Sequence, residues 1–308
     1  PGLHRHLHQR PRRGMGQTGM SGLAPIWRAS LWMFGTIASF GLMSIGGREL
    51  SADMTTLQIL FWRSAVGFMI ITIVVTRAGW HRVRTDNMRM HVGRNLAHLS
   101  AQFCWFYAIA TIPLAEVTAL EFMTPIWTVL MAALFLGEKL SRYRAAAVAL
   151  GFLGAAVIVR PGFTTVELGT ISGLGAGIGY AVGMVTARFL ALREDAIRVL
   201  FYMLAMQLPI TLVLMLAIHG WIWPDPAKTH WVFLIGATAL TAHYCINRAM
   251  QLAEAGSVTI VGFLRLPFMV AVGYIVYGEE PGIWLIVGAL IIVGGLYLNV
   301  RDAQHRQG

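Results

Sequence analysis

Long apolar runs separated by short polar joints make up the chain from about residue 26 to residue 300. A helix needs about 20 mostly apolar residues to cross the hydrocarbon of a bilayer. The runs that predict membrane-spanning helices are residues 26–46, 56–76, 92–110, 113–136, 143–159, 169–190, 197–218, 231–250, 255–277 and 283–300. The pattern therefore predicts an all-α integral membrane protein with ten transmembrane helices.

Composition agrees with this prediction. The 308 residues are 56% hydrophobic and only 12% charged, and the mean hydropathy is +0.64. A soluble domain carries about 25% charged residues, so this chain has more apolar surface than a single core buries, and the lipid bilayer is its expected surrounding. The pI of ≈ 10.3 would suit nucleic acid. That partner is excluded because the basic residues lie between apolar runs rather than on one face.

The positive charges predict the topology. If the N-terminus is cytoplasmic, 19 of the 24 lysines and arginines fall in cytoplasmic segments. Arg48, Arg160 and Lys228 then lie on the other side, and two arginines lie inside spans. By the positive-inside rule, both termini are predicted to be cytoplasmic. We expect residues 1–25 to be a disordered basic extension and residues 303–308 to be a tail.

The chain repeats itself with a shift of about 141 residues. The segment LGEKL falls on YGEEP, and Pro125 meets Pro267 at a shift of 142. Each half, residues 26–160 and 169–302, holds five spans. Because five is odd, the halves enter the membrane in opposite senses, which makes an inverted repeat. Inverted repeats are common in secondary transporters, and paired proline-interrupted helices indicate the substrate site. Pro125 and Pro267 are therefore predicted hinges.

Several segments carry a resemblance to a known family. The five-plus-five spans, the span ends LGEKL and YGEEP, the entry TTLQILFWR and the closing GALIIVGGLYLNVRD resemble the drug/metabolite transporter superfamily, EamA type. The resemblance covers about residues 27–302. It implies ten helices, cytoplasmic termini, a central cavity between the halves and movement of small metabolites across the bacterial inner membrane. The resemblance extends to exporters of amino acids and aromatic compounds and to importers of riboflavin or S-adenosylmethionine, so it does not identify the solute.

Two opposite charges fall inside spans. A charge at the centre of a span costs at least about 2.5–3.5 kcal/mol and usually faces a cavity or a partner. Glu121 lies about 12 Å into the fourth span, and Arg63 lies roughly 10 Å into the second, at 1.5 Å per residue. Both spans start on the outer side, so we expect Glu121 and Arg63 to meet. The pair is either a gate with a proton-coupled carboxylate or a fixed bridge between the two spans.

Other polar residues are candidates to line the cavity. Arg265 lies near the middle of the ninth span, two residues before Pro267, and could bind a substrate carboxylate or phosphate, or bond carbonyls freed by the proline. The remaining candidates are His98 and Gln102 in the third span, His243 and Asn247 in the eighth, and the aromatic residues Trp105 and Tyr180. The polar residues in each span are spaced i, i+4 and share a helix face. They line the cavity or hold helices together, and the aromatics stack on a planar solute or pack against lipid.

These features predict a secondary transporter of a small organic metabolite, amino-acid-like and zwitterionic or anionic, working by alternating access. A riboflavin or S-adenosylmethionine type of importer is the first alternative, and a non-transporting membrane enzyme or sensor is the second. Energy is expected from protons or from facilitated movement, since no nucleotide-binding motif occurs. No cofactor or metal is expected, because neither Cys104 nor Cys245 has metal-ligand spacing. The glycine-rich fifth and tenth spans suit helix packing or a homodimer face.

Overall fold

The structure, a computed structural model, describes residues 23–136, 141–160, 165–191, 193–252 and 261–305. Within these residues every regular element is a helix. The elements are α1 (Leu23–Ser51), α2 (Thr56–Ala78), η1 (Trp80–Val83), α3 (Met88–Thr111), α4 (Leu114–Glu121), α5 (Thr124–Leu136), α6 (Arg142–Val159), α7 (Leu168–Ala191), α8 (Ala196–Ile218), η2 (Pro226–Lys228), α9 (Thr229–Leu252), α11 (Arg265–Tyr277) and α12 (Ile283–His305). The all-helical prediction is confirmed.

The described helices match the predicted spans. Five stretches are long and apolar enough to cross a membrane: Trp27–Ser51, Thr56–Ala78, Leu114–Met131, Arg142–Val159 and Ile197–Ile218. Three shorter apolar stretches lie in α7, α11 and α12. The helices α3 and α9 are long enough but carry more polar residues, including His98 and His243. The predicted span 255–277 is described from residue 261 onward.

The fourth span is broken where its proline predicts. α4 ends at Glu121 and α5 begins at Thr124. Pro125 has no N–H to donate to the Glu121 carbonyl, and the amide of Met123 donates to Leu120 in a tighter turn at 3.0 Å. The ninth span has a matching break before α11, where Pro267 follows and the amide of Leu266 donates to Phe263 at 3.2 Å. Both spans are therefore interrupted close to their prolines.

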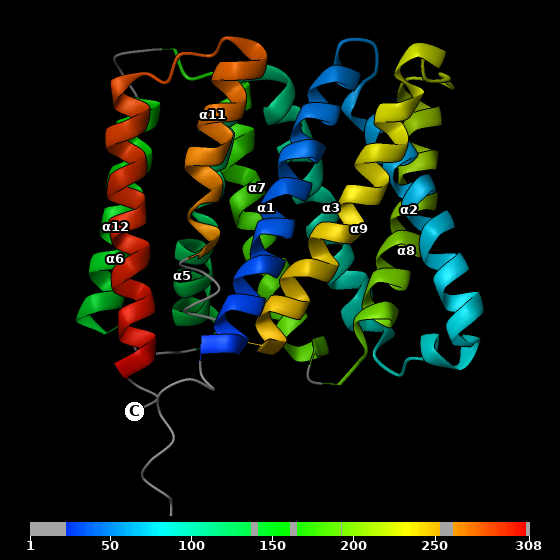
Figure 1. The fold of residues 1–308 in the computed structure, drawn as a ribbon, viewed down its shortest axis with the longest axis horizontal. Coiled ribbons are helices and arrows are strands. Elements are labelled where there is room, and N and C mark those ends of the chain that lie inside the picture. Colours follow the sequence, from blue (N-terminus) through cyan, green and yellow to red (C-terminus); the bar gives the residue numbers. More distant parts are fainter. Residues whose placement is uncertain (1–22, 137–140, 161–164, 192, 253–260, 306–308) are drawn as a thin grey trace, which may run out of the picture.

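The helices of the two halves pack as symmetry-related pairs. α1 packs against α9, and their repeat counterparts, α7 and α3, pack against each other. α2 packs against its counterpart α8, α6 against α12, and α4 against α11. Figure 1 shows α6 and α12 at one edge, α2 and α8 at the other, and α1, α3, α7 and α9 between them. This pairing is the two-fold arrangement that an inverted repeat produces.

Glycines of the fifth and tenth spans allow α6 and α12 to approach closely. A Cβ atom built on Gly154 would lie 2.6 Å from the carbonyl oxygen of Gly288, and one built on Gly288 would lie 2.6 Å from that of Gly154. Only glycine fits at such a crossing. The structure thus uses this small-residue pattern for packing within the chain, and the homodimer face expected on these spans stays a prediction.

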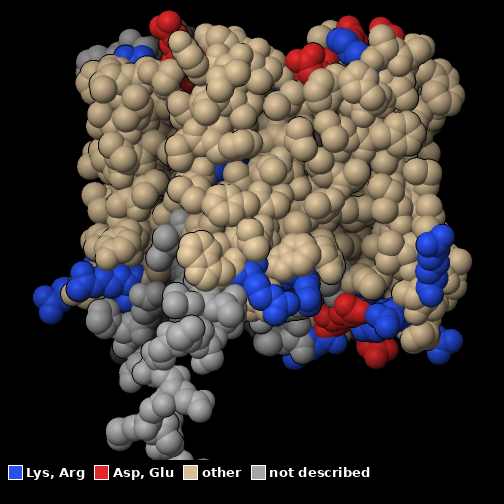
Figure 2. Space-filling view, in the orientation of Figure 1, with Lys and Arg blue, Asp and Glu red and all other residues tan. Residues whose placement is uncertain are grey.

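Charge divides the molecule into two faces. Lysine and arginine gather along the lower edge of Figure 2, and a broad band with almost no charged atoms separates that edge from the upper one. We call the lower edge the basic face; it holds η1, the starts of α3, α6 and α8, and both ends of the described chain (Figure 1). We call the upper edge the opposite face. Arg94, which the sequence placed among the cytoplasmic charges, is instead buried in α3 with 8% exposure.

The halves are joined at the opposite face by the contacts of Arg48. Its guanidinium, at the end of α1, forms an ion pair with Glu279, which follows α11. The same side chain donates from Nε to the Ile109 carbonyl at 2.6 Å and to the Ile112 carbonyl. The second oxygen of Glu279 accepts from the Leu114 amide at 2.9 Å. This opposite-face joint fixes the ends of α1, α3 and α11 to the start of α4.

The halves are also joined at the basic face, through Glu194. This residue precedes α8 and accepts hydrogen bonds from Thr85, from Asn87 Nδ2 at 3.0 Å and from His91 Nε2 at 2.6 Å. Burial by itself raises the pKa of Glu194, yet these three hydrogen bonds outweigh it, so the pKa lies below its ordinary value of 4.5. This basic-face joint ties the segment between α2 and α3 to the segment before α8.

We expect Glu194→Gln to lower the free energy of unfolding by about 1–3 kcal/mol, because buried donors lose a charged acceptor. The neighbouring change Asp195→Asn is the matched control. Asp195 pairs with Arg82 at 3.5 Å, both side chains are about half exposed, and Asn retains the helix cap. Its effect should stay within about 1 kcal/mol. Chemical unfolding of the purified protein in detergent measures both.

The same pair of variants gives a pH test. A lowered pKa means that Glu194 stabilises the fold fully above pH 4.5, its ordinary pKa, and that this contribution is lost as the pH falls through the folded-state pKa. The wild type should therefore lose more stability on acidification than Glu194→Gln. Equal losses in the two proteins, or equal effects of Glu194→Gln and Asp195→Asn at neutral pH, would contradict this role.

Candidate functional site

A buried ion pair joins the two broken spans. Arg265, the first residue of α11, donates from NH1 to Glu121 Oε1 at 2.9 Å and from NH2 to Glu121 Oε2. The two side chains are 12% and 14% exposed. Trp105 of α3 donates from Nε1 to Glu121 Oε2 at 2.9 Å, and the Arg265 guanidinium lies 4.6 Å from the ring centre of Phe40 in α1. Four elements therefore meet around one pair of charges.

The helix breaks explain why these two residues need each other. Glu121 is the last residue of α4, and the C-terminal end of a helix carries partial negative charge. Arg265 is the first residue of α11, and the N-terminal end carries partial positive charge. Each side chain therefore lies at a helix end whose partial charge has the same sign as its own, which is unfavourable. The pair compensates both, and it does so across the two halves of the molecule.

A second polar cluster surrounds Arg63 of α2, which is 1% exposed. Its NH2 group donates to Gln102 Oε1 of α3 at 2.7 Å and to Gln207 Oε1 of α8 at 3.2 Å. The amide nitrogen of Gln102 lies 2.9 Å from His98 Nε2. Because the amide nitrogen only donates, His98 accepts at Nε2. The cluster thus reaches from α2 through α3 to α8.

Three rings adjoin this cluster. The His98 ring lies 5.5 Å from that of Tyr180 in α7 and 5.6 Å from that of His243 in α9. His98 and His243, which come from the third and eighth predicted spans, are therefore neighbours. His98, Gln102 and Trp105 share one face of α3 at i, i+4 and i+7 spacing. That face connects the Arg63 cluster to the Glu121–Arg265 pair.

The expected contact between Glu121 and Arg63 is wrong. In the described part of the chain, the hydrogen bonds of Arg63 go to Gln102 and Gln207, and the ion pair of Glu121 goes to Arg265. Counting residues along a helix gives an expected depth for a side chain, but it does not give the direction in which the side chain points. Arg265 takes the place that was expected for Arg63.

Other predicted residues have mixed outcomes. Trp105 is 2% exposed, and its indole N–H donates a hydrogen bond to the carboxylate of the Glu121–Arg265 pair. The side chain of Asn247 lies outside the described part of the structure, and its role stays a prediction. Pro125 and Pro267 lie beside the two breaks, where the sequence placed hinges, and their movement stays a prediction. Among the described residues, no group of His, Cys, Asp and Glu side chains is arranged to hold a metal ion.

Sequence reasoning missed three contributors. Glu279 follows Gly278, whose φ of 66° ends α11, so the local sequence indicates a helix end and gives no sign of a contact with Arg48. Gln207 is 0% exposed, but its span is otherwise almost uniformly apolar, and one amide gave no signal. Glu194 lies in a charged segment that was interpreted only as a topology signal. In the repeat overlay Glu279 matches Glu138, and this recurrence of an acid in both halves is the indication that the sequence offers.

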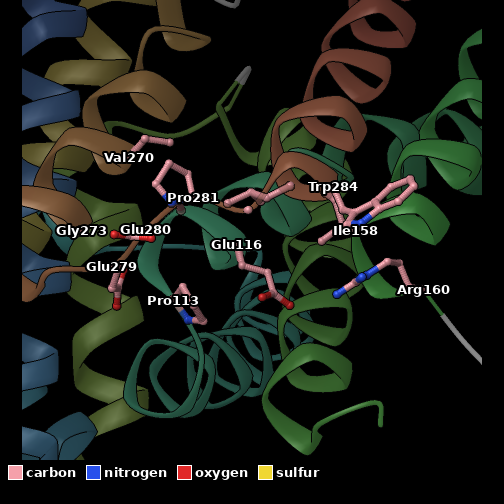
Figure 3. A pocket seen from close by; sticks show the side chains of 13 residues that line it. Pro113, Glu116, Ile158, Arg160, Val270, Gly273, Glu279, Glu280, Pro281 and Trp284 are labelled. Atoms are coloured by element: carbon pink, nitrogen blue, oxygen red, sulfur yellow. The ribbon is translucent and has the colours of Figure 1, made fainter. Parts of the chain in front are cut away.

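A pocket of about 150 Å³ opens at the opposite face between α4, α6, α11 and α12. Figure 3 shows the side chains of Glu116 and Arg160 pointing toward one another across it, with Glu279 and Glu280 on the other side. The buried charges of Glu121 and Arg63 do not line this pocket. We therefore take the interior clusters as the candidate site, and the pocket as a vestibule beside the Arg48–Glu279 contact.

Comparisons with known proteins identify the family that the chain matches. The chain matches the EamA-like transporter family twice, over residues 27–160 and 167–301. It is 30% identical over 262 residues to the pseudopaline exporter CntI of Pseudomonas aeruginosa strain UCBPP-PA14, across 83% of this chain and 89% of that protein. It is 30% identical over 253 residues to the riboflavin transporter of Brucella anthropi, across 80% and 88%.

More distant similarities point the same way. The chain is 21% identical over 262 residues to the S-adenosylmethionine uptake transporter of Rickettsia conorii, across 85% of this chain and 88% of that protein. A solved crystal structure with 18% sequence identity matches with a TM-score of 0.63, over 91% of this chain and 99% of that one. That match shows a shared fold.

A double-mutant cycle tests the partner of Glu121. Glu121→Gln and Arg265→Gln should each lower the free energy of unfolding by about 3–5 kcal/mol, because each leaves an uncompensated buried charge. The double variant should lose less than the sum of the two single losses. Chemical unfolding in detergent gives all four values. The control cycle, Arg63→Met with Glu121→Gln, should show a smaller coupling energy. A larger coupling energy in the control cycle would show that Glu121 pairs with Arg63 rather than with Arg265.

Proposed function

Because this chain belongs to the EamA-like transporter family, whose members are transporters and not enzymes, we propose that it is a secondary transporter of the bacterial inner membrane. It moves a small organic metabolite, amino-acid-like and zwitterionic or anionic, by alternating access. The observation that carries this proposal is the Glu121–Arg265 ion pair, buried between the halves at two corresponding helix breaks. Broken helices at the repeat interface typically form transporter substrate sites.

The orientation follows from charge. Lysine and arginine gather along the basic face (Figure 2), and both ends of the described chain lie there (Figure 1). The positive-inside rule supports a cytoplasmic basic face and hence cytoplasmic termini. The opposite face, with the Arg48–Glu279 contact and the pocket of Figure 3, then faces the periplasm.

Alternating access requires that the two joints open in turn. Opening toward the cytoplasm breaks the hydrogen bonds of Glu194, and opening toward the periplasm breaks the Arg48–Glu279 pair. Both joints connect one half to the other, so each responds to a rocking motion of the halves. A solute bound in the interior would have polar partners from both halves and would travel between the two openings.

Glu121 is the group we propose to couple transport to protons. When solute displaces Arg265, the carboxylate loses its counter-charge in a low-dielectric interior, and a proton becomes the alternative partner. Glu121→Gln resembles the protonated acid in shape but cannot exchange a proton, so it should remove the coupling; it also leaves Arg265 without its counter-charge. Arg265 in turn is freed to contact the solute during the same step.

A riboflavin or S-adenosylmethionine type of importer is the second candidate. It is supported by the similarity to the transporters of Brucella anthropi and Rickettsia conorii. The rings of Tyr180, His98 and His243 around one interior point would suit a planar solute.

An untargeted metabolite comparison tests the proposal. The wild type, Glu121→Gln and a control, Arg77→Gln at the exposed end of α2, are expressed in one bacterial host. We expect the wild type and Arg77→Gln to change the ratio of one metabolite class between cells and medium. Glu121→Gln should return that ratio to the value of cells without the protein, because it removes the buried charge. Enrichment in the medium identifies an exporter, and enrichment in the cells identifies an importer.

The comparison also has a contradicting outcome. If the wild type matches cells without the protein, both in this host and in the native organism, the proposed transport is wrong. If Glu121→Gln changes the ratio as fully as the wild type does, Glu121 has no part in the mechanism.

A further inference from the structure

Arg63 is a buried cation whose described partners are all neutral. Its side chain is 1% exposed, and its hydrogen bonds go to the amide oxygens of Gln102 and Gln207. Arg265 differs, because Glu121 cancels its charge with two hydrogen bonds. Within the described residues, the interior site therefore carries one balanced pair, and at Arg63 it carries a guanidinium that no described acid balances. An arginine in the membrane interior normally pairs with an acid or marks a substrate path.

Two hydrogen-bond donors at this guanidinium have no acceptor in the described structure, one on Arg63 itself and one on Gln207. In the part of the chain that the structure describes, Arg63 Nε and Gln207 Nε2 are both buried and have no acceptor. Gln207 is 0% exposed, and its oxygen already accepts from Arg63, so its amide group remains as a donor. Buried polar groups in folded proteins are nearly always hydrogen-bonded. Two such donors beside an unbalanced positive charge indicate a ligand that is negative and rich in acceptors.

The neighbouring side chains keep these donors in place. Gln102 accepts from Arg63 through its oxygen and donates to His98 through its nitrogen, so its amide cannot turn over without losing both contacts. A planar guanidinium matches the two oxygens of a carboxylate better than a single ammonium does. Arg94, one helical turn before His98, adds a second buried positive charge on the same face of α3.

We propose that the transported solute carries a carboxylate group and that Arg63 binds it, with Gln207 as the second donor. The proposal rests on the transport function above and names the solute class for that same interior site. Arg63 belongs to the first half and Gln207 to the second. A carboxylate held by Arg63 and Gln207 would thus connect the two halves at the step that carries it across. The Glu121–Arg265 pair, one turn away along α3, is left to contact the rest of the solute.

The test compares carboxylates with their uncharged amides. Thermal unfolding of the purified protein in detergent is followed with acetate and acetamide, benzoate and benzamide, and N-acetylglycine and N-acetylglycinamide, at matched ionic strength. A ligand that binds only the folded state raises the unfolding midpoint. We expect at least one carboxylate to raise the midpoint by roughly 2–4 °C more than its amide. Arg63→Met should remove that difference.

Arg77→Met is the control, since Arg77 is an exposed arginine on the same helix; it should keep the wild-type difference. If Arg63→Met does not fold, Arg63→Lys replaces it, because lysine keeps the charge but lacks the two-pronged donor. That variant should show a smaller difference. The proposal is wrong if no carboxylate exceeds its amide with the wild type, or if the difference is undiminished when Arg63 is changed.

The carboxylate test and the test of transport can fail independently of one another. If the metabolite comparison identifies a solute without a carboxylate, the carboxylate site is wrong and the transport function stands. If carboxylates bind through Arg63 and the metabolite comparison shows no change, the site stands and the transport function is wrong.

Discussion

Charge inside a membrane protein has to be compensated, and the Glu121–Arg265 pair is the contact on which the arrangement of this interior depends. Two prolines break two corresponding spans, and the breaks place a carboxylate and a guanidinium at helix ends that disfavour them. Each charge is then compensated by the other across the interface between the halves. Trp105 and Phe40 complete the surroundings from α3 and α1.

The other polar contacts between the halves form two joints, one at each face, and one interior cluster. At the opposite face the halves meet through Arg48 and Glu279, and at the basic face through Glu194 and His91. Between these two joints lies the Arg63 cluster, which is linked to the ion pair along α3. The apolar packing of α1 against α9 and of α3 against α7 holds these polar contacts at fixed positions. Charge therefore occurs where the halves meet, and the lipid-facing band carries almost none (Figure 2).

The sequence predicted the spans, the repeat and the two breaks, because each depends on local properties: length of apolar runs, periodic recurrence and the missing N–H of proline. Hydropathy placed Glu121, Arg63 and Arg265 inside spans, but the sequence placed the buried Arg94 among the cytoplasmic charges. It did not predict which of them meet. Partner choice depends on how each helix is rotated and tilted, and those angles come from contacts such as Gly154 against Gly288. Glu279 and Gln207 were missed for the same reason, because the contacts that they make form only when the helices pack together.

The central claim is that the interior between the halves is a path for solute and not a sealed core. The most direct test is cysteine accessibility in a chain whose two free cysteines, Cys104 and Cys245, are replaced by alanine. Gln102→Cys lies on the interior face of α3, and Leu96→Cys, on the same helix, faces outward with 51% exposure of the native side chain. We predict that a charged, membrane-impermeant thiol reagent modifies Gln102→Cys in membranes and leaves Leu96→Cys unmodified. An inert Gln102→Cys, measured beside a reactive Asp53→Cys in the exposed turn after α1, would contradict the claim.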